Sequence, residues 1–137
     1  MAVTRFLQNT SANIVLMAGL LALPVCGICG VTLDLAHATS RQNSVQSTLD
    51  AAVLAATYAQ QSGASDLQTK VAVHQFLIPQ LDQIDGLSCN PPSVALQATN
   101  GAVQAEIACV QSTRLLRHVG HEGVIFEVRS ASAPNAG

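Results

Sequence analysis

The sequence predicts an α+β protein with a long N-terminal helix, a short second helix and a small antiparallel β-sheet. Three patterns indicate this class. An uncharged run covers residues 6–33, apolar residues recur at steps of three and four between positions 45 and 59, and apolar and polar residues alternate from position 94 onward. The chain has 137 residues, which is the size of one ordinary domain.

The apolar segment 14–33 is long enough to cross a bilayer. Its 20 residues would form a helix of about 30 Å, which is the thickness of the hydrocarbon core. Two other interpretations are a cleaved signal peptide, with a cleavage site at Ala36-His37-Ala38, and a lipoprotein signal at Cys26 or Cys29. The apolar part of a signal peptide is usually shorter, about 7–15 residues, and a bulky residue precedes each cysteine. We therefore interpret 14–33 as a transmembrane helix.

The charges around this segment predict its orientation. Arg5 and the free amino terminus precede the segment, and Asp34 follows it. Basic residues favour the cytoplasmic side of a membrane. We therefore expect residues 1–13 to be cytoplasmic and residues 34–137 to be exported.

The first helix is expected to run without interruption from about Asn13 to Ser62, so that residues 34–62 continue it outside the bilayer. Gly63 provides the C-terminal stop, and Pro24 should produce a kink that a membrane helix tolerates. The exported part of this helix carries one apolar stripe, made of Val45, Leu49, Ala52 or Val53, Ala56 and Ala59.

The remaining region, 63–137, should begin with a second helix. Ser65 can cap it, and Gln68, three residues later, completes a capping box. Pro79 is expected to kink this helix or end it early, with Gly86 as the latest stop. The expected apolar face consists of Leu67, Val71, His74, Ile78 and Leu81.

The sheet is predicted around the turn sequence Asn100-Gly101, which is a strong hairpin signal. With a two-residue loop, the facing pairs would be Ala98 with Val103, Leu96 with Ala105, and Val94 with Ile107. Ile107 and Cys109 continue the inward face. A third strand is expected over 124–129, followed by a tail over 130–137 that frays.

The same register predicts a disulfide bond between Cys89 and Cys109. It places Cys109 opposite Pro92, three residues after Cys89, and Pro91-Pro92 stiffens an extended approach. Cys26 and Cys29 lie in the membrane segment and cannot compete. The alternative is two reduced thiols packed in the core.

The N-terminal region also resembles a known family. The matching residues are Arg5-Phe6, Ala12-Asn13-Ile14, Ala22-Leu23-Pro24, Gly30-Val31-Thr32-Leu33-Asp34, Arg41, Val45-Gln46 and the run Leu49-Asp50-Ala51-Ala52-Val53-Leu54-Ala55-Ala56. This pattern, over about residues 5–60, is similar to the TadE/TadG-like proteins of the tight-adherence (Flp-type) pilus systems of bacteria. The chain departs from the family at Ala12, where Gly is usual, and at Met17, where pilin-like members carry Glu.

The resemblance implies a pilin-like fold and a non-enzymatic role in pilus assembly and cell adhesion. The chain would be a single-pass protein of the bacterial inner membrane, with its C-terminal region in the periplasm, outside the cell or in the pilus. Its partners would be the lipid bilayer, other pilus subunits or assembly proteins, and further copies of itself. The alternative function is a secreted or membrane-tethered periplasmic binding module that presents the small sheet to a ligand.

Candidate residues for subunit association lie along the first helix. Small side chains at Gly19, Ala22, Gly27 and Gly30 permit close approach of two helix backbones in lipid. Asp34 and Asp50 are either solvated or interfacial carboxylates, or they pair with a base such as Arg41 on a neighbouring subunit.

No catalytic, cofactor or metal site is predicted. A net charge of −2 with 10% charged residues provides no basic patch for nucleic acid. Cys26 and Cys29 have redox spacing but lie in an apolar helix, where packing is the simpler interpretation. His118, His121 and Glu122 are assigned to a solvated loop and His74 to a partly buried site, rather than to a metal centre.

Overall fold

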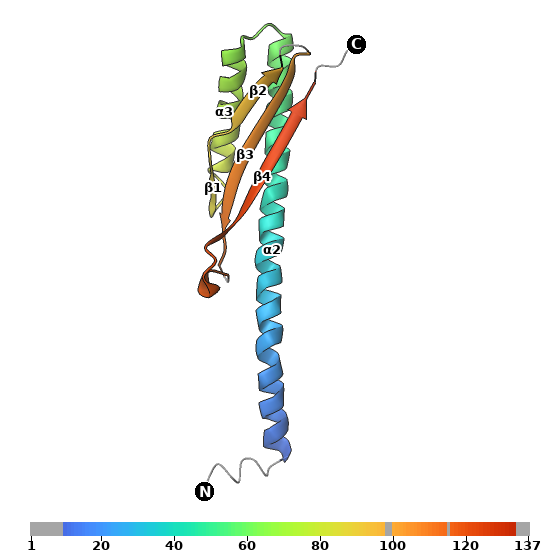
Figure 1. The fold of residues 1–137 in the computed structure, drawn as a ribbon, viewed down its shortest axis with the longest axis vertical. Coiled ribbons are helices and arrows are strands. Elements are labelled where there is room, and N and C mark those ends of the chain that lie inside the picture. Colours follow the sequence, from blue (N-terminus) through green and yellow to red (C-terminus); the bar gives the residue numbers. More distant parts are fainter. Residues whose placement is uncertain (1–9, 98–99, 115, 134–137) are drawn as a thin grey trace.

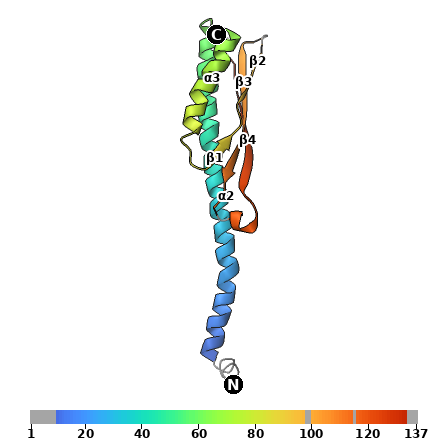
Figure 2. The same cartoon turned by 90° about the vertical axis from the view of Figure 1, so that its left-hand side faces the viewer.

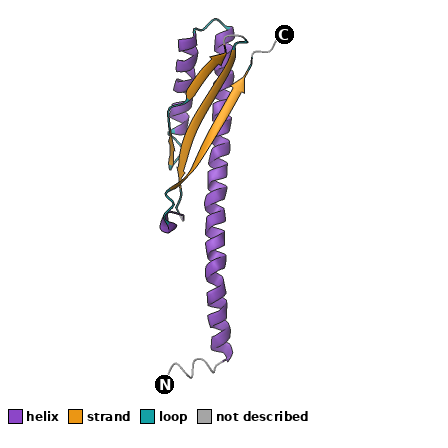
Figure 3. Cartoon of the chain, in the orientation of Figure 1, coloured by secondary structure: helices purple, strands orange, loops and turns teal. Residues whose placement is uncertain are grey.

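The predicted α+β class is confirmed. A computed structural model describes residues 10–97, 100–114 and 116–133, and contains two α-helices, one 3-10 helix and a four-stranded antiparallel sheet (Figures 1 and 3). In chain order the elements are α2 (Thr10–Gln61), α3 (Asp66–Leu81), β1 (Leu87–Cys89), β2 (Ser93–Gln97), β3 (Ala102–Ser112), η1 (Leu116–Val119) and β4 (Gly123–Ser132).

Helix α2 is the axis of the molecule. It has 52 residues and continues as one helix through Pro24, where we expected a kink. Figures 1 and 2 show it as a single unbroken helix. The helix ends where predicted, because Gly63 adopts a φ of 95°. In this conformation the N–H of Gly63 donates to the carbonyl of Gln60 at 3.0 Å, and the N–H of Ala64 donates to the carbonyl of Ala59 at 3.0 Å.

The predicted start of α3 is also confirmed. The N–H of Gln68 donates to the Oγ of Ser65 at 3.3 Å, and the N–H of Ser65 donates to the Oε1 of Gln68 at 2.9 Å, which completes the capping box. The helix continues through Pro79 to Leu81.

The predicted apolar face of α3 is wrong for most of its residues. The buried side chains are Thr69, Val73, Leu77 and Leu81, whereas Leu67, Val71 and Ile78 are exposed. Both sets have helical spacing, so periodicity alone cannot choose between them. The contact with α2 decides, because α3 turns Val73 and Leu77 toward the core that it shares with α2.

The sheet is centred on β3. Strands β1 and β2 follow one another along one edge of β3, and β4 pairs along the other from Val103↔Ser132 to Ser112↔Gly123. Because β4 pairs along nearly the whole of β3, it extends to Ser132, beyond the predicted end at 129. Residues 130–132 therefore belong to the sheet and not to a frayed tail, while residues 134–137 lie outside the described residues.

The predicted hairpin register is shifted by two residues. Leu96 faces Val103 and Val94 faces Ala105, because the loop between β2 and β3 spans four residues, 98–101. The N–H of Gly101 donates to the carbonyl of Gln97 at 3.0 Å and thereby closes this longer loop. A shift of two residues preserves the face of every side chain. Residue 98 itself lies outside the described residues.

The molecule has two layers over half its length. Helices α2 and α3 cover one face of the sheet, and the lower half of α2 extends beyond both layers (Figure 2). The core between the layers contains Val45, Leu49, Ala52, Val53, Ala56, Val73, Leu77, Leu81, Val103, Ala105, Ile107, Cys109, Phe126 and Val128. The predicted inward residues of β3 are among them, and so is the predicted stripe of α2 except for Ala59, which is half-buried outside this core.

Candidate membrane anchor and association site

The N-terminal half of α2 presents apolar side chains that nothing in the described chain covers. Within α2 an 18-residue window has a mean hydropathy of 2.5, and none of it is buried. Large apolar side chains exposed in this segment are Ile14, Val15, Leu16, Met17, Leu20, Leu21, Leu23, Val25, Ile28, Val31 and Leu33. A helix of this length and composition near the N-terminus can span a membrane or serve as a signal sequence.

The small residues of this segment do not all share one face. At about 100° per residue, Gly30 lies about 20° from Gly19 around the helix axis, and Ala22 lies about 60° to one side. Gly27 lies about 80° to the other side of Gly19, and thus about 140° from Ala22. A Cβ added at Gly19 or Gly27 would meet no atom within 4 Å. We call Gly19, Ala22, Cys26 and Gly30 the small-residue face, because Cys26 also lies within about 20° of Gly19.

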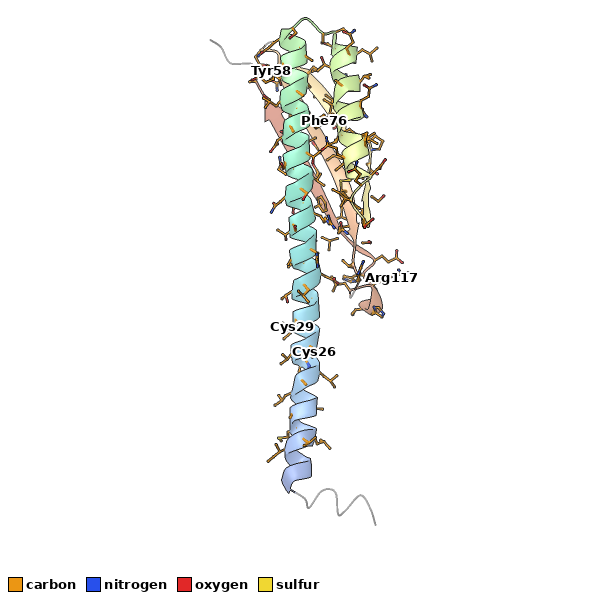
Figure 4. The ribbon with its side chains drawn as sticks, turned by 180° about the vertical axis from the view of Figure 1, so that it is seen from behind. Cys26, Cys29, Tyr58, Phe76 and Arg117 are labelled. Atoms are coloured by element: carbon orange, nitrogen blue, oxygen red, sulfur yellow. A yellow bond between two sulfur atoms is a disulfide. The ribbon has the colours of Figure 1, made fainter. Side chains whose placement is uncertain are left out.

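The cysteines of the apolar segment are free thiols. Cys26 and Cys29 are both exposed, and Figure 4 shows them on the part of α2 that projects from the folded layers. Within the described residues, no group of three or more His, Cys, Asp or Glu side chains is arranged to hold a metal ion.

Asp34 joins the anchor to the folded region. Its side chain is only 9% exposed, and its Oδ2 accepts a hydrogen bond from the N–H of Leu116 in η1 at 2.9 Å. A carboxylate at the end of the apolar segment is thus enclosed by its own chain. Beside it, the half-buried Arg41 lines a cavity of about 250 Å³ together with His37, Asp85 and Arg114.

Asp50 is exposed, but its carboxylate also has a hydrogen-bond partner in the same chain. Its Oδ1 accepts a hydrogen bond from the Nε2 of Gln46 at 2.8 Å, and the same nitrogen donates to the carbonyl of Arg129 in β4 at 3.0 Å. Asp50 therefore takes part in the attachment of α2 to the sheet. It lies nine residues beyond Arg41 on the helix, which is about two and a half turns.

Cys89 and Cys109 are joined by a disulfide bond, with their Cα atoms 4.0 Å apart. Cys109 faces Cys89 directly and not Pro92 as we predicted, because residues 87–89 form a strand of their own against β3. The N–H of Asn90 donates to the carbonyl of Ala108 at 2.9 Å. The two cysteines thus occupy a non-hydrogen-bonded pair, where facing side chains are closest.

An ionic cluster that was not predicted from the sequence lies on the outer face of the sheet. Arg129 contacts Glu106 at 3.0 Å and Glu127 at 2.6 Å. A side-chain hydrogen bond with Glu127 raises the pKa of Glu106, while hydrogen bonds with Glu106 and Arg129 lower the pKa of Glu127. The spacing of Glu127 and Arg129 along one strand could have indicated this pair. The third residue, Glu106, joins them only through the register between β3 and β4.

The chain matches no protein-family model, no curated protein and no solved structure. Its function must therefore be inferred from its own geometry. The features that bear on function are the uncovered apolar half of α2, the small-residue face, the Asp34 junction and the disulfide.

Proposed function

We propose that the chain is a non-enzymatic, single-pass component of a tight-adherence (Flp-type) pilus system. It acts through helix association, either as a minor pilin-like subunit or as an assembly protein. Residues 1–13 lie in the cytoplasm, residues 14–33 cross the bacterial inner membrane, and residues 34–137 are exported. The partners are the bilayer, other pilus subunits or assembly proteins, and further copies of the chain.

The observation that carries this proposal is the continuity of α2. Its C-terminal half packs into the two-layer domain, while its N-terminal half is apolar and uncovered. Each large apolar side chain left in water forgoes about 1.5–3 kcal/mol of burial free energy. Eleven such side chains on one projecting helix therefore require an apolar environment, and a bilayer provides it.

The alternative, a secreted binding module with a cleaved signal, has less support. Its cleavage site, Ala36-His37-Ala38, lies inside α2, and Ala38 is only 4% exposed against the folded region. Cleavage after Ala38 would also remove Asp34, which binds the backbone of Leu116. An uncleaved α2 keeps these contacts.

The disulfide supports export of the C-terminal region. Disulfide bonds form and persist in the periplasm and outside the cell, and they are rare in the cytosol. The bond between Cys89 and Cys109 lies in the folded region, on the far side of Asp34 from the apolar segment. This agrees with a cytoplasmic N-terminus and an exported sheet.

Helix association is proposed to use the small-residue face. Close approach of two helices in lipid depends on small side chains at the contact. Cys26 lies between Ala22 and Gly30 on this face, so a second copy packed there would bring two Cys26 thiols together. Cys29 lies about 60° further around the helix from Cys26.

Oxidative cross-linking in membranes tests this arrangement. We expect a Cys29→Ala variant, which retains Cys26, to form cross-linked dimers, and a Cys26→Ala variant to form fewer. Gly30→Leu should abolish the Cys26 cross-link, and Gly27→Leu is the matched control that should leave it unchanged. Equal sensitivity to both substitutions, or no dimer at all, would contradict association through this face. Fractionation of purified pili against inner membrane would then distinguish a filament subunit from an assembly protein.

A further inference from the structure

Residues 113, 114 and 116–121 form a compact loop at the membrane-proximal end of the folded region. We call it the η1 loop. A 2.9 Å hydrogen bond from the N–H of Leu116 to Asp34 fixes the position of the loop along the axis of α2. Asp34 is the residue that directly follows the apolar segment. The polar headgroup layer extends about 5–7 Å beyond the hydrocarbon core on each side. If α2 spans the membrane as proposed above, the η1 loop lies in or against this layer.

The loop is held in shape by its own hydrogen bonds. The Oγ1 of Thr113 donates to the carbonyl of His121 at 2.9 Å, and the N–H of His121 donates to the carbonyl of Leu116 at 3.1 Å. The N–H of Gly120 donates to the carbonyl of Arg117 at 3.2 Å. These bonds close the loop at both ends, so it presents a defined surface.

That surface combines an apolar side chain with positive charge. Val119 is 77% exposed, although it is a large apolar residue, and Arg114 and Arg117 are exposed within five residues of it. Figure 4 shows Arg117 directed away from α2 at the lower end of the folded region. An apolar side chain among arginines is typical of segments that lie in a membrane interface, because the arginine stems bury while their guanidinium groups reach the headgroups.

The charge of the loop is opposite to that of the chain. The η1 loop contains Arg114 and Arg117 and no Asp or Glu, so it carries +2 with its histidines neutral, whereas the chain carries −2. Three acidic groups lie beside the loop. Asp34 is enclosed, Asp85 lines one cavity with Arg114, and the exposed Glu122, which directly follows the loop, lines another with Arg114 and Arg117, so residues 113–122 together still carry +1. The loop itself therefore favours an anionic surface.

We propose that the η1 loop docks on the anionic lipid headgroups of the bilayer that α2 spans, with Val119 inserted at the interface and Arg114 and Arg117 bound to lipid phosphates. This inference rests on the proposed membrane anchor. Docking gives the exported region a second attachment beside α2. It thereby fixes the tilt of the sheet relative to the membrane.

The test uses the full chain reconstituted in lipid vesicles. In a Cys26→Ala, Cys29→Ala background, a polarity-sensitive fluorophore is placed at Val119→Cys, and in a matched control at Leu67→Cys. Leu67 is 72% exposed and lies in the first turn of α3, at the end of the folded region remote from η1 (Figure 1). The vesicles contain phosphatidylcholine alone or with phosphatidylglycerol, and brominated lipid serves as the quencher.

Docking predicts that lipid quenches the Val119 probe in vesicles with phosphatidylglycerol, while the Leu67 probe stays in water. Replacing Arg114 and Arg117 by Gln should lower the ratio of docked to free loop about fivefold for each arginine. Lys70→Gln, which removes one positive charge from α3, should not change it.

Three outcomes would overturn the inference. If the chain resists carbonate extraction but the Val119 probe is as exposed to water as the Leu67 probe, docking is refuted and the membrane anchor stands. If the chain does not stay with the vesicles, the anchor and the docking both fail. If the Val119 probe is shielded equally in neutral vesicles and the shielding rises with the ratio of protein to lipid, the loop binds a second copy of the chain instead.

Discussion

Breaking the disulfide between Cys89 and Cys109 should remove much of the stability of the sheet. The bond spans a sequence separation of 20 residues. The chain-entropy relation for a loop of this size gives an entropy change of about 11 cal/mol/K, or about 3.3 kcal/mol at 25 °C. Small domains have total stabilities of about 5–15 kcal/mol. Loss of the bond would therefore remove a large fraction of the free energy of unfolding.

Reduction is a better perturbation than substitution by serine. Cys109 is 0% exposed and packs among the core residues, and a reduced thiol keeps that apolar contact, whereas a serine would bury a hydroxyl. The main effect of reduction is thus on the unfolded chain. A Cys26→Ala, Cys29→Ala background excludes contributions from the thiols of the apolar segment.

Hydrogen exchange of the slowest β3 amides measures this effect in the intact chain. The amides of Val103 and Ile107 report opening of the whole folded region, because both residues lie in the core. Reduction should accelerate their exchange about 200-fold, which corresponds to the predicted 3.3 kcal/mol at about 1.4 kcal/mol for each factor of ten. Acceleration of less than about tenfold would refute the entropic argument. Alkylation of both cysteines in unreduced protein from the native host would refute the bond itself.

Three further perturbations test other parts of the structure. Leu20→Arg places a charge near the middle of the apolar segment at a cost of about 2.5–3.5 kcal/mol, so less protein should resist carbonate extraction, and unchanged extraction would contradict the transmembrane assignment. Asp34→Ala removes the acceptor of the Leu116 N–H and with it a charge-assisted hydrogen bond of about 1.5–3 kcal/mol. The Leu116 amide should therefore exchange faster with solvent. Asp34→Asn, which keeps an acceptor, is the control. Glu127→Gln removes the partner that raises the pKa of Glu106 and leaves Arg129 to lower it, so NMR titration should show a lower pKa for Glu106, and an unchanged value would disprove the coupling.

The ionic cluster also has a defined effect on stability against pH. Glu106 has a pKa raised above 4.5, so its contribution is fully present below pH 4.5 and is lost as the pH rises through the raised value. Glu127 has a pKa lowered from 4.5, so its contribution is present above pH 4.5 and is lost as the pH falls through the lowered value. The two contributions are lost on opposite sides of pH 4.5, so the cluster is expected to stabilise the folded chain most near this pH and less at lower and at higher pH.

Local patterns were sufficient for much of the fold. The capping box at Ser65, the stop at Gly63 and the inward face of β3 follow from side-chain chemistry and from periods of 3.6 and 2. They failed where two local solutions were equally good. The apolar face of α3 was one such case, and the length of the loop at Asn100-Gly101 was another, because only pairing with the rest of the sheet selects the register.

The candidate site depended more on distant contacts. The partner of Asp34 lies 82 residues along the chain, and that of Gln46 lies 83 residues along it. Local sequence patterns cover far fewer residues than these separations, so they cannot identify either hydrogen-bonded pair. The apolar segment could be identified from its length and composition. The two bridging cysteines were identified although the predicted register was wrong, because both registers bring Cys89 close to Cys109.

The N-terminal sequence of the protein recovered from the membrane fraction of its native host tests the central claim most directly. The claim is that α2 remains whole, with its apolar half in the bilayer and its other half in the folded region. An intact N-terminus, or one near Asn13, together with resistance to carbonate extraction, is the predicted result. A soluble product that begins after Ala38 would contradict the anchor, and with it the proposed role of the small-residue face.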